Sequence, residues 1–143
     1  MGVGRARAPW RHAPALDLDA ERRLLFLLAE LAENDLIASA HDCSDGGLGV
    51  TLAECAIASG VGATIEAATD LDPHVWLFSE SAARVVVTAP TRGVILEAAS
   101  KAGVPATVLG RTGGTHLRVE GLVDLEVAEM ASTFEGALPL LLS

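Results

Sequence analysis

The sequence predicts an α+β fold, in which a layered mixed sheet carries helices in a partial ferredoxin-like βαββαβ order, with one further helix at each end. Three observations support this class. Apolar residues recur every three or four positions in several stretches, as in amphipathic helices. Short apolar or alternating runs, typical of strands, lie between them. With 143 residues, 50% of them hydrophobic, the chain can bury one core of its own.

The chain is expected to begin its fold with a helix over residues 16–34. Its leucines recur at helical spacing, Asp17 is a suitable N-cap, and Asn34 ends the helix. The short apolar run that follows, residues 36–40, predicts a buried strand.

Further elements are expected in the middle of the chain. Residues 48–59 form a helix with an apolar side, stopped by a glycine, and residues 62–68 alternate as a half-exposed strand does. A connection with room for a short helix after Pro73 leads to a strand over 84–89, where consecutive valines favour the pleated geometry. A helix over 91–102 then ends at a glycine.

Strands over residues 105–110 and 115–120 are expected on either side of a glycine-containing turn. Asp124 would then cap a last helix, whose end Pro139 disturbs. Right-handed crossovers would place both middle helices on one face of a single sheet, and the first and last helices would cover the other face.

Composition and charge limit the possible functions. The formal net charge of −9 disfavours nucleic-acid partners, because an acidic surface repels phosphate backbones. The longest apolar runs are much too short to cross a membrane. Two cysteines without metal-ligand spacing indicate free thiols and a cytoplasmic protein, with neither a disulfide framework nor a zinc site. Residues 1–14 are expected to be a flexible lead-in without signal-peptide character, and residues 15–143 a single domain.

A cluster of polar residues precedes the second expected helix and is the main candidate for a ligand site. It consists of His41, Asp42, Ser44, Asp45, Gly46 and Gly47. The first N–H groups of a helix lack internal partners and attract anions, and glycines let a ligand approach the backbone. The carboxylates could hold magnesium, and the serine could donate to a phosphate oxygen. The alternative is a capped turn, in which Ser44 or Asp45 caps the helix. Two carboxylates beside a phosphate count against phosphate binding unless a cation intervenes.

Other reactive side chains give weaker signals. Cys43 lies inside the same loop, but the aspartates beside it oppose a thiolate, so we expect a non-catalytic cysteine. Glu80, Ser81 and Arg84 precede a strand, where they would face a ligand or another domain if this segment lies beside the first loop. Otherwise Glu80 and Arg84 form a surface ion pair of little energetic value. No spacing of histidines identifies metal ligands, which stay unassigned.

Four segments, in this order, resemble the C-terminal end of the large synthetase subunit of the phosphoribosylformylglycinamidine synthase family. They are H-D-x-S-D-G-G at residues 41–47, F-S-E-S at 78–81, A-G-V-P-A-T-V-L-G-R-T-G-G at 102–114 and G-A-L-P-L-L-L at 136–142. The likeness begins near residue 14. It implies the layered α+β architecture that this family shares with aminoimidazole ribonucleotide synthetase and related enzymes.

The resemblance also implies a part in an ATP-dependent C–N ligase of purine biosynthesis. Such enzymes convert formylglycinamide ribonucleotide to its amidine with ATP, magnesium and ammonia released from glutamine. The implied partners are the remaining synthetase domains, a glutaminase subunit and a small accessory subunit. Most ATP and Mg²⁺ ligands and the catalytic histidine lie in parts of the family sequence that this chain does not match. We therefore expect no catalytic residue here, no tight binding of ATP or Mg²⁺ to this chain alone, and no turnover by it.

Two alternatives stay open at this point. One is a non-catalytic ferredoxin-like binding or assembly module, in which the polar loop serves only as a helix cap. The other is the C-terminal domain of a related ATP-dependent small-molecule kinase.

Overall fold

The computed structural model describes residues 17–66 and 70–142, with side chains described as far as residue 137. The expected lead-in, residues 1–14, lies outside the described residues. The helices are α1 (Leu18–Glu33), α2 (Gly47–Ser59), α3 (Pro73–Phe78), α4 (Arg92–Ala102) and α5 (Val127–Leu142). The strands are β1 (Ser39–Asp42), β2 (Ala63–Ile65), β3 (Val85–Thr88), β4 (Gly110–Thr112), β5 (His116–Val119) and β6 (Val123–Glu126).

The helices begin and end where local chemistry favours it. Asp17 accepts a hydrogen bond from the Ala20 N–H at 3.0 Å and so caps α1, as the sequence predicts. The short helix expected after Pro73 is α3, and Asp72 caps it through the His74 N–H at 2.9 Å. Glycines in the left-handed conformation end both α2 and α4, which the sequence also predicts.

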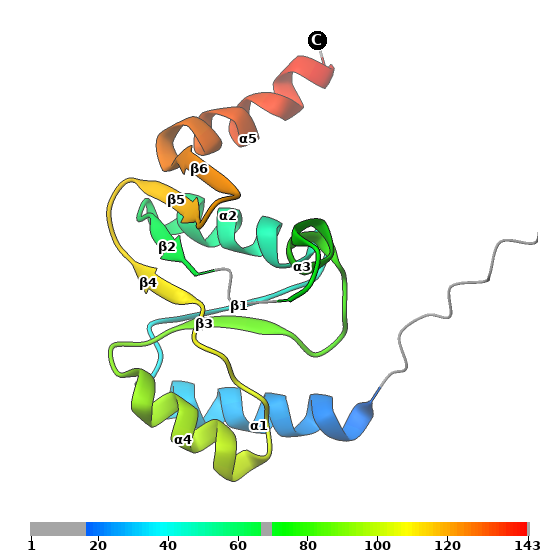
Figure 1. Ribbon diagram of the computed structural model, residues 1–143, viewed down its shortest axis with the longest axis vertical. Helices are drawn as coiled ribbons and strands as arrows, with labels where there is room; N and C mark the ends of the chain where they lie inside the picture. The colour runs from blue at the N-terminus through cyan, green and yellow to red at the C-terminus, as the bar shows by residue number, and fades with distance from the viewer. Residues whose placement is uncertain (1–16, 67–69, 143) are drawn as a thin grey trace, which may run out of the picture.

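The strands divide between two sheets. β1 and β3 form an antiparallel pair in which Asp42 lies opposite Val85. The other strands form a mixed sheet in the order β4-β2-β5-β6, with β2 parallel to β5 and antiparallel to β4. Figure 1 shows α1 and α4 together on one side of the β1–β3 pair, and α2 and α3 on its other side.

The predicted α+β class with flanking helices is confirmed, but the expectation of one continuous sheet is wrong. The expected arrangement of the helices is wrong too, because α1 packs on α4 and α5 packs on α2. The strand expected over residues 36–40 lies two to three residues later. Its partner explains the shift, since Ala38 already bonds to Thr88 and the pairing continues to Asp42.

The last third of the chain differs most from expectation. β4 begins only at Gly110, the last residue of the strand expected over 105–110, and extends into residues expected to form a turn. β2 separates it from β5. Asp124 does not cap a helix, because it lies in β6 and its carboxylate accepts from Arg118 at 3.1 Å. A tight turn at Gly121, with φ of 70°, folds β6 back onto β5. α5 continues past Pro139 to Leu142.

Two separate clusters of buried side chains form the described core. The larger lies between α2, α3 and the four-stranded sheet and consists of Cys43, Leu48, Leu52, Ile65, Leu77, Leu117 and Val119. The smaller joins α1 to α4 through Leu27, Leu31 and Ala99. Among the described residues, no helix is long and apolar enough to cross a membrane.

Candidate functional site

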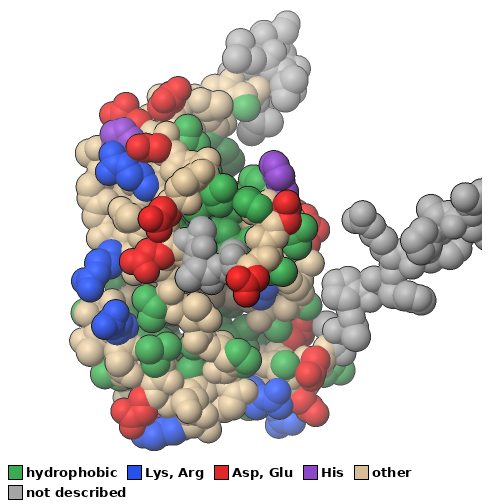
Figure 2. Space-filling view, viewed as in Figure 1, with side chains coloured by type: hydrophobic (Ala, Val, Ile, Leu, Met, Phe, Trp, Pro, Cys, Tyr) green, Lys and Arg blue, Asp and Glu red, His purple; other side chains and the backbone are tan. Residues whose placement is uncertain are grey.

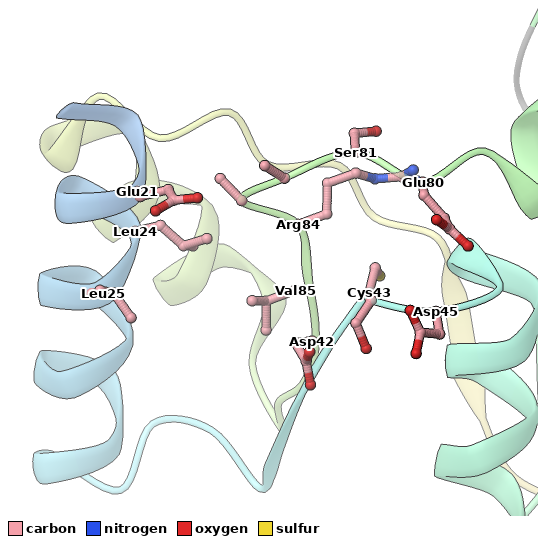
Figure 3. Close-up of a pocket in the computed structure, with 13 residues that line it drawn as sticks. Glu21, Leu24, Leu25, Asp42, Cys43, Asp45, Glu80, Ser81, Arg84 and Val85 are labelled. Atoms are coloured by element: carbon pink, nitrogen blue, oxygen red, sulfur yellow. The ribbon is translucent and has the colours of Figure 1, made fainter. Parts of the chain in front are cut away.

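An open pocket of about 450 Å³ lies at the junction of the two helix layers. One wall comes from α1, a second from the end of β1 and the loop after it, and a third from the segment that leads into β3 (Figure 3). The lining residues are Glu21, Leu24, Leu25, Asp42, Cys43, Ser44, Asp45, Glu80, Ser81, Ala82, Ala83, Arg84 and Val85.

The pocket brings together two segments that are far apart in sequence. Asp42, Ser44 and Asp45 come from the first candidate segment. The second candidate segment supplies Glu80, Ser81 and Arg84. The second segment therefore lies beside the first loop, which is the arrangement in which it would face a ligand or another domain. That these residues bind a ligand stays a prediction.

His41 is directed away from this pocket. One ring nitrogen, Nδ1, lies 2.8 Å from the Asp42 carbonyl oxygen, and the other, Nε2, lies 3.3 Å from a carboxylate oxygen of Glu54 on α2. The ring therefore ties β1 to α2. Among the described residues, His41 is not part of the pocket lining.

The start of α2 is partly closed to an external anion. The N–H of Gly46 donates to Oε1 of Glu80 at 3.0 Å, and the N–H of Gly47 donates to the Ser44 carbonyl at 3.3 Å. Gly47 is buried against the end of α3, where a Cβ would lie 2.9 Å from the carbonyl oxygens of Leu77 and Ser79. Two amides that the sequence marks as anion donors thus already have partners within the chain.

The capped-turn alternative also takes an unexpected form. No side chain of the loop caps α2, since its N-cap is Gly46, and the capping carboxylate comes from Glu80. The surface pair between Glu80 and Arg84 is not formed, because Nη1 of Arg84 donates to the Ser79 carbonyl at 3.4 Å. Glu80 therefore acts on α2 and not on its sequence neighbour.

The charges around the pocket are mainly negative. Four carboxylates, Glu21, Asp42, Asp45 and Glu80, face a single guanidinium, that of Arg84. Free phosphate would be repelled by such a lining. Among the described residues, no group of three or more His, Cys, Asp or Glu could hold a metal ion. Figure 3 shows Glu21 and Asp45 on opposite sides of the pocket.

The two cysteines differ in their burial. Cys43 is buried among the residues of the larger core cluster, although it also borders the pocket. Burial, and then the nearby Cys43 and Glu54, raise the pKa of the Cys55 thiol, which keeps it protonated at neutral pH. A protonated thiol is a poor nucleophile.

Sequence reasoning missed the contribution of α1 to the pocket. Glu21, Leu24 and Leu25 of α1 line the pocket, although the sequence predicts only a helix there. Ala83, another lining residue, has an uncommon positive φ of 58°. No local pattern marks these positions, because their shared location depends on packing between distant elements.

Comparison with known proteins decides the family. Residues 2–121 match the family described as AIR synthase related protein, C-terminal domain. The chain belongs to this family. Three of the four segments that carry the resemblance lie within residues 2–121, and the fourth, residues 136–142, lies outside this match.

Two curated relatives of this AIR synthase related domain have the same name. The chain is 43% identical over 128 residues to phosphoribosylformylglycinamidine synthase subunit PurL of Methylocella silvestris, covering 88% of this chain and 17% of that protein. It is 42% identical over 136 residues to the subunit of the same name from Moorella thermoacetica, covering 91% and 19%. The chain thus spans less than a fifth of the length of these curated relatives.

Solved structures agree with this family assignment. Thermotoga maritima PurL complexed with ATP superposes with a TM-score of 0.71 at 27% identity, over 81% of this chain and 22% of that chain. The T. maritima assembly named PurLQS gives a TM-score of 0.70 at 28% identity, over 82% and 22%. The α+β architecture of this domain is therefore that of PurL structures.

Proposed function

We propose that this chain is the C-terminal domain of a phosphoribosylformylglycinamidine synthase subunit. In that enzyme it would serve an ATP-dependent ligase that turns formylglycinamide ribonucleotide and ammonia into the amidine, ADP and phosphate. The observation that carries the proposal is the 43% identity to a PurL subunit across 88% of this chain. Relatives of the same name do not favour the assembly-module or kinase alternatives.

The geometry supports a composite site in which this domain supplies one side. The pocket gathers hydrogen-bonding groups from the Asp42–Asp45 loop and from Glu80–Arg84, yet it has one guanidinium and no metal-binding cluster among the described residues. Phosphate charge and Mg²⁺ would therefore be neutralised or held by the rest of the subunit. Here the chain's own task is to orient and enclose a ligand, with Arg84 as the group suited to an anionic part of it.

The surface of α1 supports packing against further protein. Leu27 and Leu31 are buried on its inner side, whereas Leu18, Leu25 and Phe26 are 66%, 66% and 65% exposed. Exposed apolar side chains outside the buried side of a helix can pack against another protein surface. Figure 2 shows hydrophobic side chains reaching the surface at several places on one face. The missing cover would come from the remaining synthetase domains.

Ligands and partners follow from the same proposal. T. maritima PurL has been solved with ATP, with ADP and with FGAR, and PurLQS as an assembly. For this chain we propose ATP and Mg²⁺ as ligands of the complete enzyme. Its partners would be a glutaminase and a small accessory subunit, in the cytoplasm.

A domain graft tests the proposal. Residues 17–143 would replace the matching segment of T. maritima PurL, and ADP release would be measured with formylglycinamide ribonucleotide, ATP and an ammonium salt. We expect turnover by the graft and none by the 143-residue chain alone or by the truncated recipient. A folded, ATP-binding graft without turnover would contradict the proposal, and turnover by the chain alone would contradict the composite site.

Substitution of two arginines, one inside the pocket and one outside it, tests whether the pocket takes part in the reaction. Arg84→Ala removes the guanidinium of the pocket lining, and Arg118→Ala removes one on β5 that is half-exposed and bonded to Asp124. In the graft we expect Arg84→Ala to lower kcat/KM by about tenfold or more, as loss of a charged hydrogen bond does. Arg118→Ala should leave it unchanged. Equal effects of both substitutions would argue against a role of this pocket in the reaction.

A further inference from the structure

α2 begins at residues that cannot cap it with their own side chains. Its N-cap is Gly46, which has no side chain and lies at φ of 82°. Neither Ser44 nor Asp45 makes a side-chain cap. A helix start without a cap leaves several N–H groups without partners. The partner that fills this place must come from elsewhere in the fold.

Glu80 supplies that partner from a distant segment. Its Oε1 accepts from the Gly46 N–H at 3.0 Å, across 34 residues of sequence. A carboxylate at this position also interacts favourably with the positive end of the helix dipole. Glu80 lies in the extended segment after α3, which forms one wall of the pocket, whereas Gly46 follows directly on the opposite wall.

Two backbone contacts join the same walls. The Cys43 N–H donates to the Arg84 carbonyl at 2.9 Å, at the end of the pocket where β1 and β3 pair. At the other end, Gly47 packs directly on the carbonyls of Leu77 and Ser79. Between these contacts, the bond from Gly46 to Glu80 is the side-chain link from one wall to the other.

We infer that Glu80 is a positioning residue, which holds the two polar walls of the pocket in register by capping α2. It acts through the Gly46 amide, and the property that matters is the reach of its acceptor oxygen, more than its charge. The role of this register in turnover rests on the proposed function, whereas the link itself does not.

The rate of thiol labelling of the full 143-residue chain measures how firmly the bond between Glu80 and Gly46 holds the two walls together. Cys43 borders the pocket and is 7% exposed, so in a Cys55→Ser background its labelling rate reports separation of the walls. Glu80→Asp keeps the charge but shortens the side chain, and Glu80→Gln keeps the length and an acceptor oxygen. We expect Glu80→Asp to be labelled about tenfold faster than the parent, the usual value of one cap, and Glu80→Gln within about twofold of it.

Two control variants make this outcome decisive. Glu120→Ala changes an exposed glutamate outside the pocket lining and should label at the parent rate. Leu31→Ala weakens the other core cluster, so it lowers global stability without touching the link. The inference is overturned if Glu80→Asp labels like the parent, if Glu80→Gln labels as fast as Glu80→Asp, or if Leu31→Ala accelerates labelling equally.

Kinetics of the graft test the functional consequence. We expect kcat to fall about tenfold in Glu80→Asp and to recover in Glu80→Gln, because a positioning hydrogen bond tolerates the neutral amide. Loss of kcat in Glu80→Gln equal to that in Glu80→Asp would show that the charge itself acts, which overturns the positioning role. An inactive parent graft would refute the proposed function, and the labelling comparison would still decide the link.

Discussion

Substitution of Gly47 by alanine tests whether the close approach of α2 to the end of α3 holds the pocket wall in place. Gly47 has φ of 68°, and its Cβ would lie 2.9 Å from the carbonyl oxygens of both Leu77 and Ser79. Gly60, at the other end of α2, has nearly the same φ of 67°, with nothing within 4 Å of a Cβ. The two glycines therefore share the backbone strain of a substitution and differ only in the contact.

The magnitude follows from this difference. Gly60→Ala should cost about 1–2 kcal/mol of unfolding free energy for a left-handed alanine. Gly47→Ala should cost about 2–5 kcal/mol, because the backbone carbonyls must also move, at about 1–3 kcal/mol for overpacking. Urea unfolding of the 143-residue chain, followed by far-UV circular dichroism, measures both, with the m-values compared. Equal midpoints for the two variants would refute the argument that Gly47 is required by contact.

Three further outcomes follow from single sites. Leu31→Ala should lower the unfolding free energy by about 2–5 kcal/mol, since Leu31 is 2% exposed. Leu18→Ala, at a 66% exposed position, should change the unfolding free energy by about 0.5 kcal/mol or less. Thermal and urea unfolding of the two variants would measure the difference. The hydrogen bond from Lys101 lowers the pKa of Glu97. This pair therefore stabilises the fold at pH values above the ordinary Glu pKa, and the stabilisation is lost as the pH falls through the lowered pKa. Lys101→Met should return the pKa of Glu97 toward its ordinary value in an NMR titration. Burial raises the pKa of the Cys55 thiol, so alkylation of this site at mildly alkaline pH, followed by peptide mass spectrometry, should be slower than for a free cysteine peptide.

Elements with strong local signals could be predicted from the sequence. α1 has leucines at helical spacing and an aspartate cap, and α2 and α4 end at glycines whose left-handed conformation is built into the residue type. The consecutive valines of β3 likewise need no distant partner to be recognised as a strand. These signals depend on residues within one or two helical turns, which is why one sequence suffices to find them.

Strand pairing could not be predicted in the same way. Asp124 is of a residue type that often caps helices. However, a turn at Gly121 brings residues 123–126 back onto β5, and pairing with β5 makes them a strand despite the capping propensity of Asp124. β2 comes to lie between β4 and β5 because its backbone is closely approached on both sides, at Gly62 and Gly110. Pairing of this kind depends on contacts between residues far apart in the sequence, such as Ala63 and Leu117.

The candidate site shows the same division. The chemistry of the two polar segments is visible in their residue types, and the fold does bring them together. The partner of the Gly46 amide lies 34 residues away, and the third wall comes from α1, near the start of the described chain. Neither could be found from spacing, because each depends on how the helix layers meet.

The division of the core into two clusters gives the pocket its particular position. The β1–β3 pair lies between the clusters, and a two-stranded pair of such short strands contributes little stability alone. Leu25 belongs both to the pocket lining and to the exposed apolar side of α1. A protein surface that covers α1 therefore also covers one wall of the pocket. A ligand in the pocket and a partner on α1 would both contact this side chain, and if one changes the affinity for the other, the effect is the same in both directions.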